Sequence, residues 1–397
     1  MKLSGQQQKA MEAVRAWIES ETQQVFRLWG YAGTGKTTIA KELSSLVGGD
    51  VRFAAFTGKA ASVLAKKGCF PASTIHRLIY VPHSKCVERL ERLEAELSAA
   101  QREVPPPEKE IRRLERAILV ESDRVKSPGF TLNRESDLHG ASLLILDEVS
   151  MVGKEMAKDL LKFRVPVLCL GDPAQLPPVG SAGWLIKGEP DYLLTEIHRQ
   201  ASGSPVLQLA RQVRSGERLE PCVVGDSRVV EKGELTIEDV ASFDQVICGT
   251  NKARRDLNRQ IRRQLGYDDP FPQEGDKLIA LRNNHERGLL NGSQWEVQHV
   301  ERYDDRLWMT IHGDGNSQVV TAFAHYFEGR EREIRPWEMR EAEHFDFGYA
   351  ITCHRAQGSE WDNVLVIDES RIFRANARKW LYTAITRAAD SVTVVLS

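Results

Sequence analysis

The chain carries, at Val25–Thr37, the segment VFRLWGYAGTGKT, in which an apolar stretch leads into GYAGTGKT at Gly30–Thr37. A helical pattern follows through Leu43, so the order is strand, glycine-rich loop and helix. The glycines allow backbone N–H groups to approach phosphate oxygens, Lys36 can reach the β- and γ-phosphates, and the Thr37 hydroxyl can hold Mg²⁺. The segment therefore predicts a nucleotide site in an α/β domain. The residues that we assign to the nucleotide are Gly30, Gly33, Thr34, Gly35, Lys36, Thr37 and Thr38.

A second apolar segment, Leu143–Leu146, reads as a buried parallel strand and ends in Asp147 and Glu148. At the end of such a strand Asp147 can coordinate Mg²⁺, directly or through water, and Glu148 can orient and deprotonate an attacking water. A chance match to the loop pattern alone is expected in roughly one or two per cent of chains of this length. Because both features occur together, they predict hydrolysis of ATP with Mg²⁺.

A third apolar segment, Val165–Leu170, leads into GDPAQLPPV at Gly171–Val179. Gln175 in this segment can sense the γ-phosphate, as a glutamine orients water in other phosphate-loop enzymes. The alternative is a rigid proline-rich turn with no part in the chemistry.

The composition limits the classes of protein that fit. The length of 397 residues exceeds the size of one hydrophobic core, so two or more packed units are expected. No apolar run approaches the roughly 20 residues needed to cross a bilayer, and we expect no membrane partner. The start of the chain lacks a secretory signal, and the six cysteines are scattered, which indicates reduced thiols in the cytoplasm. The net charge of -2 means that any nucleic acid would lie in a local groove.

Together these segments resemble superfamily 1 helicases of the 5′-to-3′ branch, which includes RecD-like proteins and the phage Dda helicase. The likeness covers nearly the whole chain. It implies an α/β fold with two RecA-like phosphate-loop domains, and the segment Gly171–Pro178 resembles motif III. The segment Leu3–Ala10 resembles the adenine-reading Q motif, with Gln7 at the matching position.

The second half of the chain carries further helicase-like motifs. Leu194–Gln200 resembles motif IV and Leu381–Ala388 resembles motif VI, and the likeness implies that Arg199 and Arg387 contact the nucleotide from the opposite domain. A single arginine in a helical segment is more often a solvated surface residue. An arginine finger stabilises the transition state only when the cleft is closed, so hydrolysis would be coupled to approach of the domains.

The resemblance also implies a path for a DNA strand. It runs along segments similar to motif Ia (Phe56–Ala61), motif Ib (Ser73–His76), motif III and motif V (Tyr349–Glu360). The candidates near the strand are Thr57, Lys59, His76, Pro177, Pro178, Thr352, His354 and Gln357. For His76, Pro177, His354 and Gln357, a role as a buried structural residue is an equal alternative.

Two insertions interrupt the expected RecA-like domains. We place domain 1A at residues 1–79 and 140–196, insertion 1B at 80–139, domain 2A at 197–263 and 342–397, and insertion 2B at 264–341.

Insertion 1B has apolar residues at helical spacing on both sides of Pro105–Pro107, which predicts a helical hairpin. The resemblance implies a pin that splits the duplex, and the best candidate for a β-hairpin is Val125–Arg134.

In insertion 2B, apolar residues recur with a period of two, which predicts short strands at residues 277–281, 294–300, 307–311 and 318–323. A small SH3-like barrel is implied by the resemblance. Before it, Asn251–Gln264 forms a basic helix that either faces the DNA backbone or is a solvated surface.

These observations predict an ATP-dependent DNA helicase that translocates 5′-to-3′ on single-stranded DNA and binds junctions of single- and double-stranded DNA. A single-stranded-DNA-binding, replication or recombination protein is a further expected partner, in a bacterial or phage-infected cell. One alternative is a DNA-stimulated translocating ATPase that unwinds little on its own. Another is a non-motor phosphate-loop NTPase or kinase. A nuclease would need a further cluster of metal-binding carboxylates beyond Asp147 and Glu148, and the sequence offers none.

Overall fold

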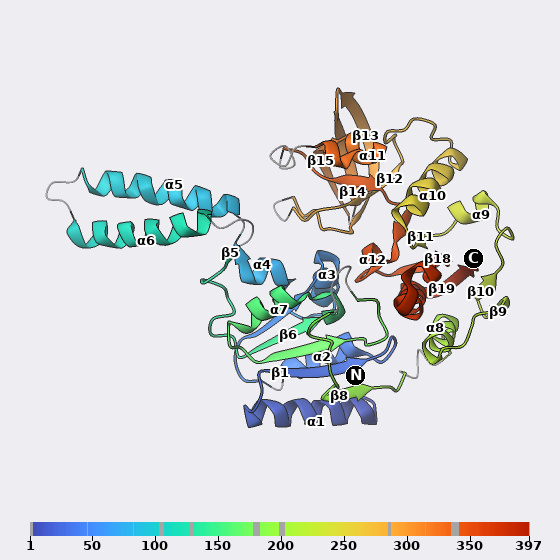
Figure 1. Cartoon of the computed structure of the whole chain (residues 1–397), viewed down its shortest axis with the longest axis horizontal. Coiled ribbons are helices and arrows are strands. Elements are labelled where there is room, and N and C mark those ends of the chain that lie inside the picture. Colours follow the sequence, from blue (N-terminus) through green and yellow to red (C-terminus); the bar gives the residue numbers. More distant parts are fainter. Residues whose placement is uncertain are drawn as a thin grey trace.

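The computed structural model describes residues 3–45, 47–81, 83–102, 107–126, 131–177, 183–197, 203–284, 287–313, 315–334 and 341–396. Within these ranges the chain forms two six-stranded sheets, one five-stranded sheet and one two-stranded sheet (Figure 1). None of the helices in the described ranges has the length and apolar character needed to cross a membrane.

The first six-stranded sheet is parallel throughout, in the order β3-β2-β6-β7-β1-β8. Its strands are β1 (Val25–Gly30), β2 (Val51–Ala55), β3 (Ala72–Thr74), β6 (Leu143–Asp147), β7 (Val167–Gly171) and β8 (Tyr192–Leu194). All residues of β6 and β7 are buried, which explains why these central strands read as continuous apolar runs. The predicted α/β fold with a parallel sheet is confirmed here.

Helices cover both faces of this sheet because alternate strand residues point to opposite sides. One face packs on α1 (Gly5–Ser20), α2 (Lys36–Ser44) and α3 (Gly58–Lys66). The other face packs on α4 (Ile75–Ile79), η1 (Val149–Met151) and α7 (Lys154–Leu161). The loops at the carboxyl ends of β1, β6 and β7 therefore lie next to one another at one edge of the sheet.

The second six-stranded sheet has the order β17-β11-β18-β19-β10-β9 and is parallel except for the β9–β10 pair. Its strands are β9 (Cys222–Val224), β10 (Ser227–Val230), β11 (Gln245–Cys248), β17 (Ala350–Thr352), β18 (Trp361–Ile367) and β19 (Ala388–Val395). The helices around it are α8 (Pro205–Ser215), α9 (Ile237–Ala241), α10 (Asn251–Gln264), α12 (Cys353–Ala356), η4 (Ser370–Asn376) and α13 (Ala377–Ile385).

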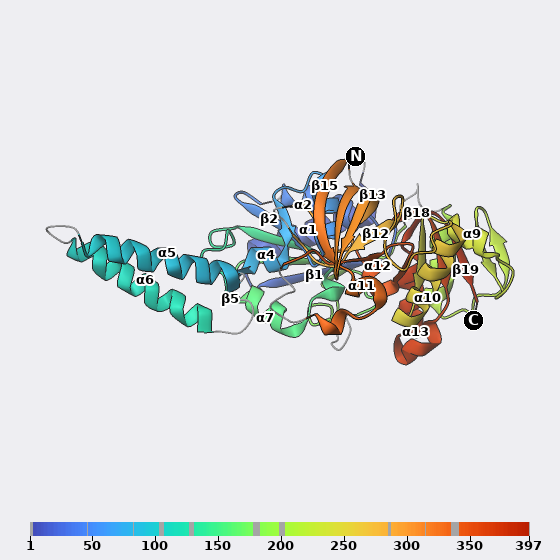
Figure 2. The same ribbon diagram turned by 90° about the horizontal axis from the view of Figure 1, so that it is seen from above.

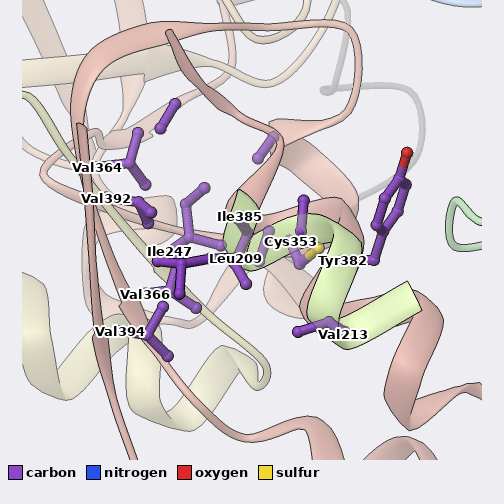
Figure 3. Packing of buried hydrophobic residues seen from close by; sticks show 14 of the residues in the cluster. Leu209, Val213, Ile247, Cys353, Val364, Val366, Tyr382, Ile385, Val392 and Val394 are labelled. Atoms are coloured by element: carbon purple, nitrogen blue, oxygen red, sulfur yellow. The ribbon is translucent and has the colours of Figure 1, made fainter. Parts of the chain in front are cut away.

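The core of this second unit lies between the sheet and the helices α8, α12 and α13 (Figure 3). Leu209 and Val213 of α8 and Ile385 of α13 pack against alternate strand residues such as Val364 and Val392. The opposite face of the sheet is covered by α9 and α10. The chain therefore contains two separate α/β units with parallel sheets.

The five-stranded sheet is antiparallel, in the order β15-β14-β13-β12-β16. Its strands are β12 (Lys277–Ala280), β13 (Gln294–Tyr303), β14 (Arg306–Gly313), β15 (Asn316–Phe323) and β16 (Phe345–Phe347). The short helices α11 (His325–Glu328) and η2 (Glu331–Glu333) follow β15. The four predicted strands are confirmed, and β14 alternates as expected, with Leu307, Met309 and Ile311 buried. β16 was not predicted from the sequence, because a strand of three residues is too short to show an alternation of apolar and polar side chains.

A helical hairpin projects from the first unit (Figures 1 and 2). Its helices, α5 (His83–Ala100) and α6 (Glu108–Lys126), confirm the predicted hairpin. At its base β4 (Tyr80–Val81) pairs antiparallel with β5 (Thr131–Leu132).

The placement of the pin at Val125–Arg134 is wrong at its start, because Val125 and Lys126 are the last residues of α6. Residues 127–130 lie outside the described residues, and Thr131–Leu132 pairs with β4 rather than with a strand at 125. The physical reason is that the first helix breaker after Glu108 is Pro128, so α6 continues beyond the expected boundary.

The basic helix α10 connects the antiparallel sheet to the second parallel sheet through buried ion pairs. Arg254 contacts Asp346, and Arg262 donates to Asp276 at 2.8 Å. The side chains of Arg262 and Asp276 are 5% and 0% exposed. Two of the five arginines in this helix therefore have structural partners and do not form a solvated basic face.

We expect Asp276→Asn to lower the free energy of unfolding by about 3–5 kcal/mol, because it leaves the buried charge of Arg262 without its counter-ion. Urea unfolding of the variant and of the parent chain measures this difference. Asp268→Asn is the control, since Asp268 is exposed on the same connection. A loss below about 1 kcal/mol would show that the pair does not hold the two sheets together.

Candidate functional site

The glycine-rich loop joins β1 to α2 and needs its glycines for conformation and space. Gly33 and Gly35 both have φ of 78°, in the left-handed region, and Gly35 is the N-cap of α2. A methyl group on Gly30 would lie 2.6 Å from Thr34 Oγ1, so this position also excludes a side chain. The glycines therefore permit the tight loop conformation that a phosphate needs at the start of a helix.

The lysine and threonine at the start of α2 lie where the sequence predicts. Lys36 Nζ donates to the carbonyl oxygens of Gly30 and Tyr31, at 2.6 and 3.2 Å, within the loop itself. Thr37 Oγ1 donates to Asp147 Oδ2 at 3.0 Å. The predicted metal-binding pair is thus brought together from α2 and β6. A hydroxyl and a carboxylate oxygen are donors of the type that Mg²⁺ takes, so these residues fit the ion.

Gln7 supports the loop from α1. It is 2% exposed, its amide nitrogen donates to the carbonyl of Thr34 at 3.2 Å, and its Oε1 accepts from the N–H of Ser4. The neighbouring Gln6 bonds to the backbone N–H groups of Thr195 and Glu196, both at 2.8 Å. Two adjacent glutamines therefore fix α1 against the loop and against the end of β8. Contact of Gln7 with adenine stays a prediction.

Glu148 follows β6 in a left-handed conformation with φ of 53°. Burial raises the pKa of its carboxyl group, and the charges of Asp147 and Asp172 act in the same direction. The charges of Arg387 and Lys36 oppose this shift. Glu148 is therefore a half-buried acid at the end of β6, and its raised pKa is a shift of the kind expected for a general base.

Gln175 lies in the turn after β7. It is 6% exposed, and its Oε1 accepts a hydrogen bond from the Ser150 hydroxyl at 3.4 Å. This bond connects the turn to η1, which follows Glu148. The structure thus brings Gln175 to the same edge of the sheet as the two acids.

Arg387 stands between α13 and β19 on the second parallel sheet. Its guanidinium donates to the carbonyls of Ser359 and Thr383, both at 3.2 Å. Because its charge is one of those that lower the pKa of Glu148, it lies within electrostatic reach of the site on the first sheet. The other predicted arginine, Arg199, lies outside the described residues, as does Pro178.

Side chains from the second sheet also contact the turn after β7. Gln357 donates to the carbonyl of Leu176 at 2.8 Å, and the Leu176 N–H donates to Thr383 Oγ1 at 2.8 Å. Tyr382 reaches the same turn through Asp172. These contacts of Thr383, Tyr382 and Asp172 were not predicted from the sequence, although all three residues lie within the segments that resemble helicase motifs VI and III.

The candidate DNA-binding residues divide into buried and partly exposed groups. Thr352 and Gln357 are buried, which favours a structural role for both side chains. The partly exposed group is Thr57, Lys59, His76, Pro177 and His354.

Both histidines in this group lie beside aromatic rings. The ring of His76 lies 6.0 Å from that of Phe56, and the ring of His354 lies 5.8 Å from that of Phe373. Burial lowers the pKa of both histidines, so each carries little charge at neutral pH.

Three parts of the molecule meet at the start of α3. A methyl group on Gly358 would lie 2.8 Å from Thr57 Oγ1. A methyl group on Gly58 would lie 2.9 Å from Leu290 Cδ2 and 3.0 Å from Asn283 Oδ1, both in the antiparallel unit. The predicted DNA-facing segments from both parallel sheets are therefore neighbours.

Comparisons with known proteins agree with this two-part site. A family model described as an AAA domain matches residues 2–227, and one described as a UvrD-like helicase C-terminal domain matches residues 347–395. The chain is 27% identical over 392 residues to the ATP-dependent RecD2 DNA helicase of Deinococcus radiodurans, and the match covers 91% of this chain. It covers 46% of that relative, so the chain spans about half of its length.

Solved structures show the same fold. The chain aligns with a structure of two coordinating Pif1 helicases at forked double-stranded DNA at a TM-score of 0.56 and 19% identity, covering 99% of this chain and 92% of that one. A Bacteroides Pif1 helicase in complex with ADP-AlF3 and single-stranded DNA aligns at a TM-score of 0.52 and 18% identity, with the same coverage of 99% and 92%. The arrangement of two α/β units with parallel sheets is thus shared with these proteins.

Proposed function

Because this chain belongs to the AAA-domain family and is a RecD-like and Pif1-like member of the superfamily 1 helicases, we propose that it is an ATP-driven motor that moves along single-stranded DNA and unwinds duplexes. The observation that carries the proposal is the ATP site built from two sheets. Gln357 and Thr383 of the second unit bond to Leu176, in the turn of the first unit that contains Gln175, and the charge of Arg387 lowers the pKa of Glu148. A phosphate-loop kinase needs no such second sheet, so the motor explains more of the chain.

Each side chain of the site has a proposed role in hydrolysis. Lys36 and the loop N–H groups bind the phosphates, and Thr37 and Asp147 hold Mg²⁺, which would neutralise charge on the phosphates when bound. Glu148 takes the proton of the attacking water, and Gln175 senses the γ-phosphate. Arg387, together with Arg199, stabilises the charge that develops as the bond breaks.

Closure of the cleft would convert hydrolysis into movement. The γ-phosphate contacts both parallel-sheet units only when these units approach each other. Loss of the γ-phosphate on hydrolysis therefore favours the open state. Gln357 and Thr383 reach across to Leu176 in the turn that contains Gln175, which supports transmission of this change to the segments proposed to hold DNA.

The proposed DNA path follows Thr57, Lys59, His76, Pro177 and His354. The buried Thr352 and Gln357 are proposed to support the backbone of the segments that line this path. His76 and His354 offer neutral rings for base stacking, which makes binding tolerant of sequence. The antiparallel unit, proposed as the SH3-like domain 2B of residues 264–341, borders this path where Leu290 meets Gly58.

The remaining domain limits are proposed as 1–79 with 140–196 for domain 1A and 197–263 with 342–397 for domain 2A, except that β16 (Phe345–Phe347) belongs to the antiparallel sheet. The helical hairpin of residues 80–139 is proposed as domain 1B, placed to meet the duplex. The partners proposed are single-stranded DNA and junctions with duplex DNA. Movement 5′-to-3′ is proposed from the RecD-like and Pif1-like relationship.

The rate of ATP hydrolysis with and without single-stranded DNA tests the motor. We expect a thymidine oligonucleotide to raise the rate, and we expect the effect to weaken as salt is added, because phosphate contacts release counterions. A rate that is unchanged by the oligonucleotide at low salt would favour the non-motor NTPase.

We expect Lys36→Ala to lower ATP hydrolysis by about 10²–10³-fold, because the transferring phosphate loses a positioned cationic donor. Lys41→Ala is the matched control, since Lys41 lies on the same helix but is exposed. Steady-state hydrolysis by both variants measures the difference. Equal rates for the two variants would refute the assignment of the phosphate loop.

A further inference from the structure

One tyrosine hydroxyl connects three segments of the ATP site. Tyr382 of α13 is 2% exposed and belongs to the hydrophobic core of the second parallel sheet. Figure 3 shows its ring at the edge of this core, with the hydroxyl pointing away from the aliphatic side chains. The ring is thus fixed by packing while the hydroxyl reaches outward.

Both hydrogen bonds of this hydroxyl cross to the first parallel sheet. It donates to Asp172 Oδ2 at 2.8 Å, and it accepts from the backbone N–H of Ala32 at 2.9 Å. Ala32 belongs to the phosphate loop, and Asp172 is the first residue after β7. Burial raises the pKa of Tyr382 well above its ordinary value, with a further contribution from Asp172, so the phenol keeps its proton and donates.

Asp172 links this hydroxyl to the turn that contains Gln175. It is 1% exposed, and its Oδ1 accepts from the N–H of Ala174 at 2.9 Å. Without the phenol, this buried carboxylate would lose a hydrogen-bond donor. Such a loss is costly in a dry site.

Tyr31 and Gly33, the residues on both sides of Ala32, also contact the second unit. The Arg214 guanidinium of α8 lies 3.7 Å from the ring centroid of Tyr31. A methyl group on Gly33 would lie 2.5 Å from Leu207 Cδ1, also of α8. The second unit therefore contacts Tyr31, Ala32 and Gly33 of the phosphate loop. Of these three contacts, the one made by Tyr382 also includes the carboxylate of Asp172.

We propose that Tyr382 is a positioning residue for ATP hydrolysis, whose hydroxyl aligns the phosphate loop and Asp172 with the second unit when the cleft closes. The inference rests on the proposed function, since it concerns the same ATP site. The hydroxyl acts through Ala32 and Asp172 rather than on the reacting phosphate. Its loss should therefore slow the step that needs the closed cleft and leave binding of ATP to the loop nearly unchanged.

The chain offers a matched control in Tyr349. Its hydroxyl also bridges a buried carboxylate and a backbone N–H, donating to Asp276 at 3.0 Å and accepting from Lys277 at 3.1 Å. These bonds join the second parallel sheet to the antiparallel unit. Tyr349→Phe thus removes the same chemical group and the same kind of bonds at a place remote from Ala32.

We expect Tyr382→Phe to lower kcat by about 10–100-fold, the range that corresponds to the loss of a hydrogen bond to a buried charged group, with KM for ATP changed less than about threefold. Tyr349→Phe should leave both constants near those of the parent chain, although the two variants should lose similar stability in urea. A double variant with Asp172→Asn should lose less than the product of the single effects, because an amide costs less than a carboxylate when its donor is removed.

A second measurement is independent of turnover. Hydrogen exchange of the Ala32 amide should accelerate in Tyr382→Phe and stay unchanged in Tyr349→Phe, because only the first removes the acceptor of that N–H. The proposal is overturned if Tyr382→Phe hydrolyses ATP at the parent rate, or if Tyr349→Phe shows the same loss of kcat.

Hydrolysis of each variant is measured with and without single-stranded DNA, which separates this inference from the helicase proposal. A parent chain without DNA stimulation would contradict the motor. In that case the basal rates and the Ala32 exchange would still decide the role of Tyr382.

Discussion

Arg387→Ala is expected to lower kcat for ATP hydrolysis by about 10³–10⁵-fold, the range measured when an arginine finger is supplied or removed. Arg387 belongs to the second parallel sheet, yet its charge acts on Glu148 of the first. We propose that its guanidinium reaches the transferring phosphate when the two units approach each other. Binding of ATP to the loop should change little, because the arginine contributes mainly to the transition state.

Two further variants make this result specific. Arg378→Ala changes an exposed arginine of α13, the helix that precedes Arg387, and should hydrolyse ATP at the parent rate. Arg387→Lys keeps a charge but loses the planar fork, and we expect a rate between those of the parent and of Arg387→Ala. Full activity of Arg387→Ala in single-turnover and steady-state assays would mean that the second sheet does not complete the site.

Glu148→Gln is expected to bind ATP and single-stranded DNA but to hydrolyse ATP about 10²–10⁴-fold more slowly, because the amide cannot accept a proton from water. The substitution keeps the size of the side chain and removes the charge of a half-buried acid, so the fold should be retained. Nucleotide binding by fluorescence titration and hydrolysis by phosphate release measure the two effects separately.

The control for Glu148 is Glu155→Gln, which changes an exposed acid on the next helix. We expect it to behave as the parent chain in both assays. Loss of ATP binding in Glu148→Gln, or a rate within about twofold of the parent, would remove Glu148 from the role of general base.

The parts of the site that the sequence predicts are those encoded by short segments. The phosphate loop and the Asp147–Glu148 pair each lie where a strand ends, and parallel pairing of β6, β7 and β1 then brings them together. The bond between Thr37 and Asp147 is therefore expected from the order of the elements. The strands of the antiparallel sheet were also predicted, because buried and exposed residues alternate along β14 and along parts of β13 and β15.

The sequence could not predict contacts between segments that are far apart in the chain. The hydroxyl of Tyr382 meets Ala32 and Asp172 across separations of 350 and 210 residues. The burial of Arg254 and Arg262 could not be predicted either, because their partners, Asp346 and Asp276, belong to the antiparallel unit. The sequence of a basic helix does not show which of its arginines form buried ion pairs. The extent of α6 was missed because helix propensity alone does not fix where a helix ends.

Strand separation on duplexes that carry one single-stranded tail tests the motor most directly. The duplex is supplied with either a 5′ tail or a 3′ tail, and release of the labelled strand is followed with ATP, without ATP, and with Glu148→Gln. The proposal predicts that the parent chain opens the 5′-tailed duplex only when ATP is present, and that Glu148→Gln opens neither. Opening of neither duplex by a DNA-stimulated parent chain would reduce the function to translocation, and opening of the 3′-tailed duplex alone would contradict the proposed direction of movement.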